Sequence, residues 1–402
     1  MDTLIEIYHR LLIEIIPSYH RKFYDDFTMD NRLIGIIGAR GVGKTTFLID
    51  YLRKHYDGSN QALYISADNL YFVEHTLLEI VDQFVKDFDG QLLCIDEIHR
   101  YKNWNQELKN IYDSYPKLSV IFSGSSSIDL IKGKYDLSRR AILKTMYGFS
   151  FREFLEIHEK KKYSIIKLSD LYQNAGVYSQ KLAKIPKLLG LFKQYLREGY
   201  YPTFLEMGSY EAYSYSLRGI VDKIIYQDVS SFYSLNTSNL DTLKKIIYFF
   251  ATSQPGSVNV NRLAGSLKKD HTTISEYVQI LRDTGLLRFL LQNKQGHALV
   301  RDAEKIYVDN TNLLFALNKE IGKEPLIGLS RELFVISNLQ NAAYRVFFSK
   351  QADVECEDAI FEIGGKSKTS SQLKGKKGYL VKDDILIGGP GTIPLYLFGF
   401  LS

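Results

Sequence analysis

The sequence predicts an α/β protein whose N-terminal part is a parallel sheet covered by helices on both faces. Three observations lead to this fold class. Short apolar runs alternate with helical patterns between residues 31 and 147, the first run is followed by a glycine-rich loop, and a later run ends in two carboxylates. Strands buried on both faces of a parallel sheet show such continuous apolar runs. The expected strands are 33–38, 62–66, 92–96, 120–123 and 142–146.

The composition is that of an ordinary globular protein with room for two or three domains. The 402 residues are 45% hydrophobic and 24% charged, and the net charge of +5 permits contact with nucleic acid without indicating it. Cys94 lies in an apolar strand pattern, which favours a buried side chain over a redox role. No apolar stretch approaches the roughly 18 residues that a membrane span needs. We therefore expect a cytoplasmic protein that makes no membrane contact.

The glycine-rich segment, residues 38–45, reads Gly-Ala-Arg-Gly-Val-Gly-Lys-Thr and fits the pattern G-x4-G-K-[ST]; we call it the phosphate loop. Its glycines allow backbone N–H groups to approach a phosphate, and the helix that follows adds positive potential. We expect Lys44 to reach the β- and γ-phosphate oxygens of ATP and Thr45 to bind Mg²⁺, although the loop alone does not distinguish ATP from GTP. The other expected nucleotide contacts are Gly38, Arg40, Gly41, Val42, Gly43 and Thr46.

A second motif, Asp96-Glu97, ends the apolar run 92–96. Ligands of α/β sheets bind at the carboxyl ends of the strands, so both carboxylates are expected at the site. Asp96 would hold Mg²⁺ through a water molecule, and Glu97 would orient and deprotonate the attacking water. Together with the phosphate loop, this pair favours hydrolysis over an ordinary acidic turn.

The expected strand 120–123 is followed by Gly124-Ser125-Ser126-Ser127, and one serine hydroxyl at this strand end would polarise the attacking water or contact the γ-phosphate. Ser125 is the first candidate and Ser123 the alternate; a helix N-cap is the competing interpretation for either serine. One expected strand, 62–66, separates the loop-bearing strand from the Asp-Glu strand. This order is typical of oligomeric ATPases rather than of small-molecule kinases.

These motifs, with Ser138-Arg139-Arg140 and the segments 149–154, 195–202 and 305–310, resemble a group of bacterial and archaeal AAA+ ATPases. In that group the P-loop NTPase domain precedes a winged helix and a nuclease-like C-terminal domain of unknown function. The resemblance implies that Arg140 is an arginine finger that enters a neighbouring subunit's site, and hence that the protein is a homo-oligomer. Arg139 occupies the group's usual glycine, so the choice between the two arginines stays open. A surface arginine without a catalytic role is the alternative.

The chain is expected to divide into five parts. They are an N-terminal helix and connector (1–30), the AAA+ domain (31–150), a helical region (151–255), a winged helix (256–300) and a mixed α/β C-terminal domain (301–402). In the winged helix, residues 272–284 predict a helix with Ile274, Tyr277, Val278 and Leu281 on one apolar face. Its opposite face carries Ser275, Glu276, Gln279 and Arg282, fewer basic residues than a DNA-reading helix usually has. DNA contact aided by Lys268 and Lys269 therefore competes with a role in protein contact.

Asp353 and the later Glu362-Ile363-Gly364 resemble the Asp…Glu-x-Lys core of restriction-type nucleases, in which two carboxylates hold Mg²⁺ beside a lysine. Gly364 stands at the lysine position, and Lys366 and Lys368 lie two and four residues further. We therefore expect a nuclease-like domain without nuclease activity, used for binding or assembly.

The sequence thus predicts Mg²⁺-dependent ATP binding and hydrolysis, coupled to conformational change in the helical, winged-helix and C-terminal regions. Two other functions remain: a slow-hydrolysing nucleotide-dependent switch or scaffold, and a DNA-processing factor that acts through the winged helix. A protein client is expected, but its identity, the pathway and the oligomer size are not specified.

Overall fold

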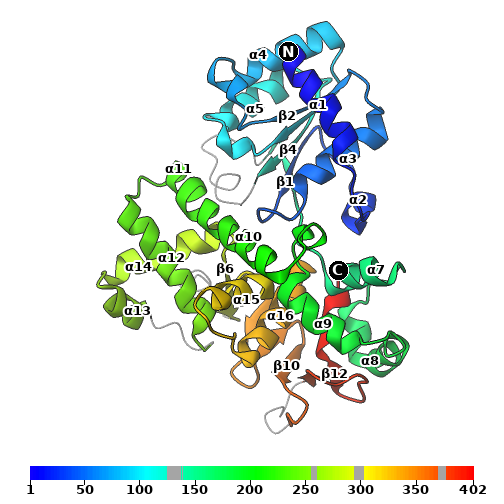
Figure 1. Cartoon of the computed structure of the whole chain (residues 1–402), viewed down its shortest axis with the longest axis vertical. Coiled ribbons are helices and arrows are strands. Elements are labelled where there is room, and N and C mark those ends of the chain that lie inside the picture. Colours follow the sequence, from blue (N-terminus) through cyan, green and yellow to red (C-terminus); the bar gives the residue numbers. More distant parts are fainter. Residues whose placement is uncertain (125–136, 138, 255–259, 294–302, 370–376) are drawn as a thin grey trace. The chain divides into compact units, whose positions relative to one another are not determined.

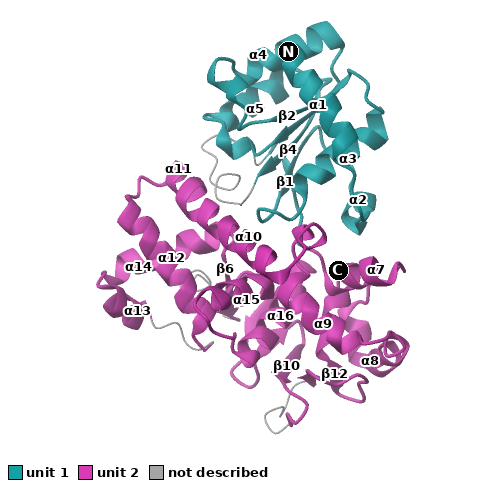
Figure 2. Ribbon diagram, viewed as in Figure 1, with its two compact units in different colours: residues 1–148 teal, residues 149–402 magenta. Residues whose placement is uncertain are grey.

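The computed structural model describes residues 1–124, 137, 139–254, 260–293, 303–369 and 377–402. The chain forms two compact units, residues 1–148 and residues 149–402 (Figure 2). Figure 1 labels most of their helices and some of their strands. None of the helices in the described ranges combines the length and the apolar character that a membrane span requires.

The first unit is built on a five-stranded sheet in which every neighbouring pair of strands is parallel, in the order β2-β3-β4-β1-β5. The strands lie within one residue of the expected ranges at each end, so the predicted parallel sheet is confirmed. They are β1 (Leu33–Ile37), β2 (Ala62–Ser66), β3 (Leu92–Asp96), β4 (Ser119–Gly124) and β5 (Ile142–Thr145).

Helices pack on this sheet, with α1 and α3 in contact with each other and with β2, and α4 in contact with α5. Helix α4 begins at a capping box: the Thr76 hydroxyl accepts from the Glu79 N–H over 3.2 Å, and the Glu79 carboxylate accepts from the Thr76 N–H over 2.8 Å. The helices of this unit are α1 (Asp2–Glu14), α2 (Lys22–Asp26), α3 (Lys44–Tyr56), α4 (Leu77–Phe88) and α5 (Trp104–Ser114), with 3₁₀ turns at Leu70–Val73 and Ile98–Arg100.

The second unit combines helices with a mixed sheet of seven strands, in the order β12-β11-β10-β9-β8-β6-β7. The strands are β6 (Leu287–Gln292), β7 (Ala303–Val308), β8 (Val346–Phe348), β9 (Val354–Cys356), β10 (Ala359–Gly364), β11 (Lys377–Lys382) and β12 (Thr392–Pro394). The helices are α7 (Phe151–Glu159), α8 (Leu168–Leu182), α9 (Leu188–Glu198), α10 (Tyr210–Lys223), α11 (Ser230–Phe232), α12 (Thr237–Thr252), α13 (Val260–Leu267), α14 (His271–Asp283), α15 (Thr311–Glu320) and α16 (Ile327–Asn341), with a π-helical turn at Ile224–Val229 and 3₁₀ turns at Pro202–Leu205 and Leu395–Phe400.

The segment 256–300 contains the helices α13 and α14; α14 matches the helix expected at 272–284, and its apolar face is buried. The strand that follows them, β6, pairs antiparallel with β7 and parallel with β8. The segment after the helix pair is therefore part of the seven-stranded sheet that also holds the C-terminal strands.

Buried amide groups join the helices of this unit to the start of α15. The Asn312 carbonyl accepts from the Tyr200 N–H over 2.8 Å and from the Tyr213 hydroxyl over 2.6 Å. The Asn310 amide donates to the Tyr201 hydroxyl over 2.9 Å. Because buried polar groups need partners, these contacts tie the segments 195–202 and 305–310 together.

Candidate active site

The phosphate loop connects β1 to α3, and three of its glycines stand where the backbone demands glycine. Gly41 and Gly43 have φ angles of 84° and 97°, in the left-handed region that side chains disfavour. A Cβ atom on Gly38 would lie 2.1 Å from the carbonyl oxygen of Met146, just beyond β5. The loop conformation is therefore fixed partly by the sheet beneath it.

Lys44 begins α3 with a side chain that folds over the loop. Its ammonium group donates to the carbonyl oxygens of Gly38, at 2.9 Å, and Ala39, at 3.1 Å. Val42 is fully buried and supports the loop from below, whereas Arg40 and Thr46 are partly exposed. The expected nucleotide contacts thus lie together around one loop.

The structure brings the two expected metal-binding residues into contact. The Thr45 hydroxyl donates to Oδ2 of Asp96 over 2.5 Å, although the residues are 51 positions apart in the chain. The same oxygen accepts from the Tyr64 hydroxyl over 2.9 Å, and Oδ1 accepts from the Ser123 hydroxyl. A carboxylate and a hydroxyl oxygen are the kind of ligands that Mg²⁺ prefers, with water and phosphate oxygens completing its shell. These residues therefore fit a magnesium ion that accompanies a nucleotide.

Glu97 follows Asp96 in a left-handed backbone conformation, with φ 51°. Its N–H donates to the Ser123 hydroxyl over 3.0 Å and to Asp96 Oδ1 over 3.1 Å. Its Oε2 atom lies 3.6 Å from Nε2 of His99, and it is buried without a hydrogen bond among the described residues. A buried carboxylate oxygen of this kind suits a group that has to accept a proton.

Of the two serine candidates, Ser123 and Ser125, the structure describes only Ser123. Ser123 is fully buried, and its hydroxyl contacts Asp96 and the N–H of Glu97. From β4, it therefore holds the carboxylate of Asp96 and the backbone of Glu97. Ser125 lies outside the described residues, and so does Ser138.

Arg140 lies at the opposite edge of the sheet from the phosphate loop. Its guanidinium donates to both carboxylate oxygens of Asp113, over 3.0 and 3.1 Å. Ile142 pairs with Ile34, so Arg140 precedes the amino end of β5 while the loop follows the carboxyl end of β1. Five residues of strand separate the two ends by roughly 16 Å. Arg140 therefore does not line the site of its own chain, and Arg139 is exposed nearby.

Arg21 contacts the site although no sequence motif marks it as functional. Its buried guanidinium donates to the carbonyl oxygen of Val42, in the loop, over 3.3 Å. It also donates to the carbonyl oxygens of Tyr147, at 2.8 Å, and Gly148, at 3.0 Å. The loop is thereby joined to the last residues of the first unit.

In the second unit, Lys368 contacts the carboxylate of Glu362, although the nuclease-like sequence pattern has Gly364 in place of its lysine. Lys368 Nζ lies 2.5 Å from Glu362 Oε1, and this hydrogen bond raises the pKa of Lys368. The aliphatic part of Lys368 crosses Gly364, where it lies 2.8 Å from the place of a Cβ atom. Lys368 therefore reaches Glu362 although it lies four residues beyond the expected lysine position, because the missing side chain of Gly364 makes room for it. Lys366 is exposed.

The other acidic groups nearby are satisfied by the protein itself. Asp353 accepts from the Ile363 N–H over 2.7 Å. Glu332, on α16, accepts from Lys305 over 2.9 Å and from the Tyr307 hydroxyl over 2.7 Å, and burial raises its pKa. Within the described ranges, no group of three or more histidine, cysteine or acidic residues is placed to hold a metal ion. The expected lack of nuclease activity stays a prediction.

Two residues on the polar face of α14 make side-chain contacts within the unit. Gln279 donates to Asp283 over 2.6 Å, and Arg282 lies 3.3 Å from the same carboxylate with its guanidinium over the Phe289 ring. Lys269 contacts Asn239 over 3.4 Å, whereas Lys268 is exposed. DNA contact by this helix stays a prediction.

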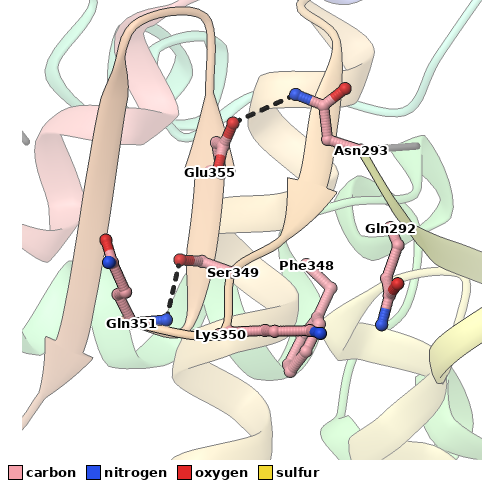
Figure 3. A pocket seen from close by; sticks show the side chains of 7 residues that line it. All are labelled: Gln292, Asn293, Phe348, Ser349, Lys350, Gln351 and Glu355. Atoms are coloured by element: carbon pink, nitrogen blue, oxygen red, sulfur yellow. Dashed lines mark hydrogen bonds between the residues drawn. The ribbon is translucent and has the colours of Figure 1, made fainter. Parts of the chain in front are cut away.

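A pocket of about 350 Å³ opens beside β6, β8 and β9 of the second unit (Figure 3). Its side chains are mostly polar, and Asn293 donates to Glu355 over 3.1 Å across it. The ring of Phe348, in its wall, also lies 5.6 Å from the ammonium group of Lys305. The lining residues are Gln292, Asn293, Phe348, Ser349, Lys350, Gln351 and Glu355. No group predicted to act on a nucleotide lines it.

Comparisons with known proteins agree with this geometry. Residues 30–155 match a family model described as an AAA domain, and residues 189–324 match one described as a domain of unknown function, DUF8612. Two uncharacterized proteins of Methanocaldococcus jannaschii are similar over most of the chain. MJ1637 is 27% identical over 405 residues, 89% of this chain and 82% of that protein. MJ1544 is 25% identical over 360 residues, 85% of this chain and 74% of that protein.

Solved structures with some likeness include Orc1 of Aeropyrum pernix in complex with DNA, at 13% identity. That match covers 79% of this chain and 92% of Orc1, with a TM-score of 0.32. DnaA of Aquifex aeolicus bound to AMPPCP is 18% identical over 69% of this chain and 86% of its own, with a TM-score of 0.28. The N-terminal part of the chain has the parallel sheet and phosphate loop of a P-loop fold and is similar over residues 30–155 to the AAA domain family, and a region that matches DUF8612 follows it.

Proposed function

We propose that the protein binds ATP with Mg²⁺ and hydrolyses it to ADP and phosphate. The observation that carries this proposal is the contact between Thr45 and Asp96, 2.5 Å apart. It joins the phosphate loop to the Asp-Glu strand end at the carboxyl edge of the sheet, where ligands of α/β proteins bind. The match to the AAA domain favours ATP over GTP.

Each residue of the site has a role in this reaction. Lys44, beside the loop carbonyls, is placed to exchange those contacts for the β- and γ-phosphate oxygens. A magnesium ion bound by Thr45 and, through water, by Asp96 would neutralise charge on the phosphates. Glu97 takes a proton from the water that attacks the γ-phosphorus, and ADP leaves with the bridging oxygen.

The decisive experiment measures phosphate release and nucleotide retention by wild type, Lys44→Ala and Glu97→Gln. We expect Lys44→Ala to lose binding, because the loop loses its cation. Glu97→Gln should retain ATP and turn it over about 10²–10⁴ times more slowly, the usual effect of removing a general base. Lys54→Ala is the matched control, since Lys54 lies on the same helix, is half-exposed and pairs with Asp50. Equal turnover by Glu97→Gln and wild type would refute the assignment.

We further propose that nucleotide state is transmitted out of the first unit through residues 146–148. Two contacts support this: Gly38 packs against the carbonyl of Met146, and Arg21 joins the Val42 carbonyl to those of Tyr147 and Gly148. A phosphate that changes the loop conformation would therefore move the residues that lead into the second unit.

The proposed ATPase acts as a homo-oligomer. The position of Arg140 supports this, because a guanidinium at the amino edge of the sheet can reach a phosphate loop only in another copy of the chain. Mixing of single-arginine variants decides whether Arg140 or the neighbouring Arg139 performs this role.

A further inference from the structure

The carboxylate of Asp96 is contacted by three hydroxyl groups at once. Those of Thr45 and Ser123 belong to segments that the motifs single out, but the third belongs to Tyr64 on β2. The Tyr64 hydroxyl donates to Oδ2 over 2.9 Å, the oxygen that also accepts from Thr45. Tyr64 is only 5% exposed and Asp96 3% exposed, so water does not replace these contacts easily.

These donors determine which way the carboxylate faces. Rotation about the last side-chain bond of an aspartate is soft, so a buried carboxylate adopts the orientation that its donors impose. Ser123 holds Oδ1 from β4, while Tyr64 and Thr45 hold Oδ2. Because Thr45 lies in the first turn of α3 next to the phosphate loop, Tyr64 keeps Oδ2 on the side where a metal ion bound to Thr45 would lie.

Tyr64 is suited to this task because its phenol hydroxyl donates directly to the carboxylate of Asp96. A hydrogen bond to a charged acceptor is stronger than one between neutral groups. The ring is also held between strands, since Tyr64 pairs with Cys94 in the sheet.

We propose that Tyr64 is a positioning residue of the metal site, which holds Asp96 toward the Mg²⁺ that accompanies ATP and so lowers the Mg²⁺ concentration that nucleotide binding requires. The inference rests on the proposed function, because it assigns a role within the same site. If Tyr64 only filled the core, phenylalanine would replace it without effect, whereas a positioning role requires the hydroxyl.

The test is Tyr64→Phe in the full-length protein, with binding of a fluorescent ATP analogue measured against Mg²⁺ concentration. We expect the half-saturating Mg²⁺ concentration to rise about tenfold, which corresponds to about 1.4 kcal/mol. Binding of the analogue in EDTA should stay within about twofold of wild type. Because the assay measures nucleotide binding and not turnover, the result does not depend on the rate of hydrolysis.

Tyr8→Phe is the matched control. Tyr8 lies on α1 of the same unit, is 1% exposed, and its hydroxyl has no hydrogen bond among the described residues. Removing that hydroxyl tests the general effect of losing a buried phenol, and the Mg²⁺ requirement should not change. If Tyr64→Phe proves unstable, Ser123→Ala releases the other carboxylate oxygen and should raise the Mg²⁺ requirement in the same direction.

The outcomes separate the two proposals. A Mg²⁺ requirement equal to that of wild type, or the same rise in Tyr8→Phe, would overturn the role of Tyr64 and leave the proposed function intact. A wild-type protein that binds no nucleotide at any Mg²⁺ concentration would overturn both.

Discussion

At the scale of single residues, Gly38 is required by the backbone that lies next to it. A Cβ atom there would lie 2.1 Å from the Met146 carbonyl oxygen and 3.3 Å from a methyl group of Val42. A flexible side chain can yield to such a contact, but a backbone carbonyl held by β5 cannot. Glycine is therefore needed at position 38 for two reasons: a side chain would clash with the Met146 carbonyl, and a phosphate has to approach the loop backbone.

We predict that Gly38→Ala lowers the free energy of unfolding of the first unit by about 1 to 3 kcal/mol, the usual range for overpacking. Trp104 is the only tryptophan of the chain, and it is buried against Phe122 in this unit, with ring centroids 6.0 Å apart. Denaturant unfolding followed by its fluorescence measures the effect.

Gly219→Ala provides the control for this measurement. Gly219 lies in α10 of the second unit, and no atom lies within 4 Å of the place of its Cβ atom. Alanine is favoured over glycine inside a helix, so the substitution should leave the Trp104 transition unchanged. Coincident unfolding curves for Gly38→Ala and wild type would contradict the packing argument.

Sequence patterns identify the site residues that belong to a local motif and miss those that act through tertiary contact. Lys44, Thr45, Asp96 and Glu97 follow from spacing, because the loop and the strand end are continuous segments. Tyr64 belongs to an apolar run with no motif of its own, although β2 pairs with the strand that carries Asp96. Arg21 sits in a basic, aromatic connector whose sequence does not show that its guanidinium reaches residues 126 positions away.

At the scale of elements, the strands of the first unit could be predicted and the sheet of the second could not. Each strand from β1 to β4 is a short apolar run between helical patterns, whereas β5, at the edge of the sheet, is half polar and mostly exposed. In the second unit β8, β9 and β12 have three residues each, and α15 and α16 separate β7 from β8. Such short strands have little pattern of their own, and their pairing depends on partners that are distant in sequence.

Arg21 connects the N-terminal segment to the phosphate loop and to residues 147 and 148. Without this side chain, ATP should still bind, but binding should no longer affect the residues around position 148. We predict that Arg21→Gln still binds ATP, because Lys44 and the loop glycines are unchanged. The shorter side chain loses its contacts to the Tyr147 and Gly148 carbonyls, which lie 2.8 and 3.0 Å from the guanidinium in the native chain. Hydrogen exchange with and without ATP should show a nucleotide-dependent change at residues 146–150 in wild type but not in the variant.

Lys22→Gln is the neighbouring control, since Lys22 is half-exposed and pairs with Asp26 over 2.7 Å on the surface. It should show the wild-type change in hydrogen exchange. A nucleotide-dependent change that persists in Arg21→Gln would show that residues 146–148 respond through another contact.

At the scale of the whole molecule, the position of Arg140 predicts that activity depends on contact between copies of the chain. We expect Arg140→Ala and Lys44→Ala each to be inactive alone, and a mixture of the two to regain activity. In the mixture, the intact phosphate loop of one variant meets the intact arginine of the other. Specific activity of wild type should also rise with protein concentration.

The same mixing experiment with Arg139→Ala decides between the two arginines. Asp113→Asn tests whether the loss of activity comes from the ion pair, because it removes the partner of Arg140 and keeps the arginine. Specific activity that does not vary with concentration, together with inactive mixtures, would exclude a shared site.

The pairing of β6 also limits where the chain can be truncated to express a stable fragment. β6 is an interior strand, with β7 on one edge and β8 on the other. A fragment cut at residue 300 would carry α13, α14 and β6 without either neighbour, and the bare edges of β6 would offer N–H and C=O groups to other chains. Such a fragment should aggregate, so a truncation that keeps α13 and α14 has to continue through β12.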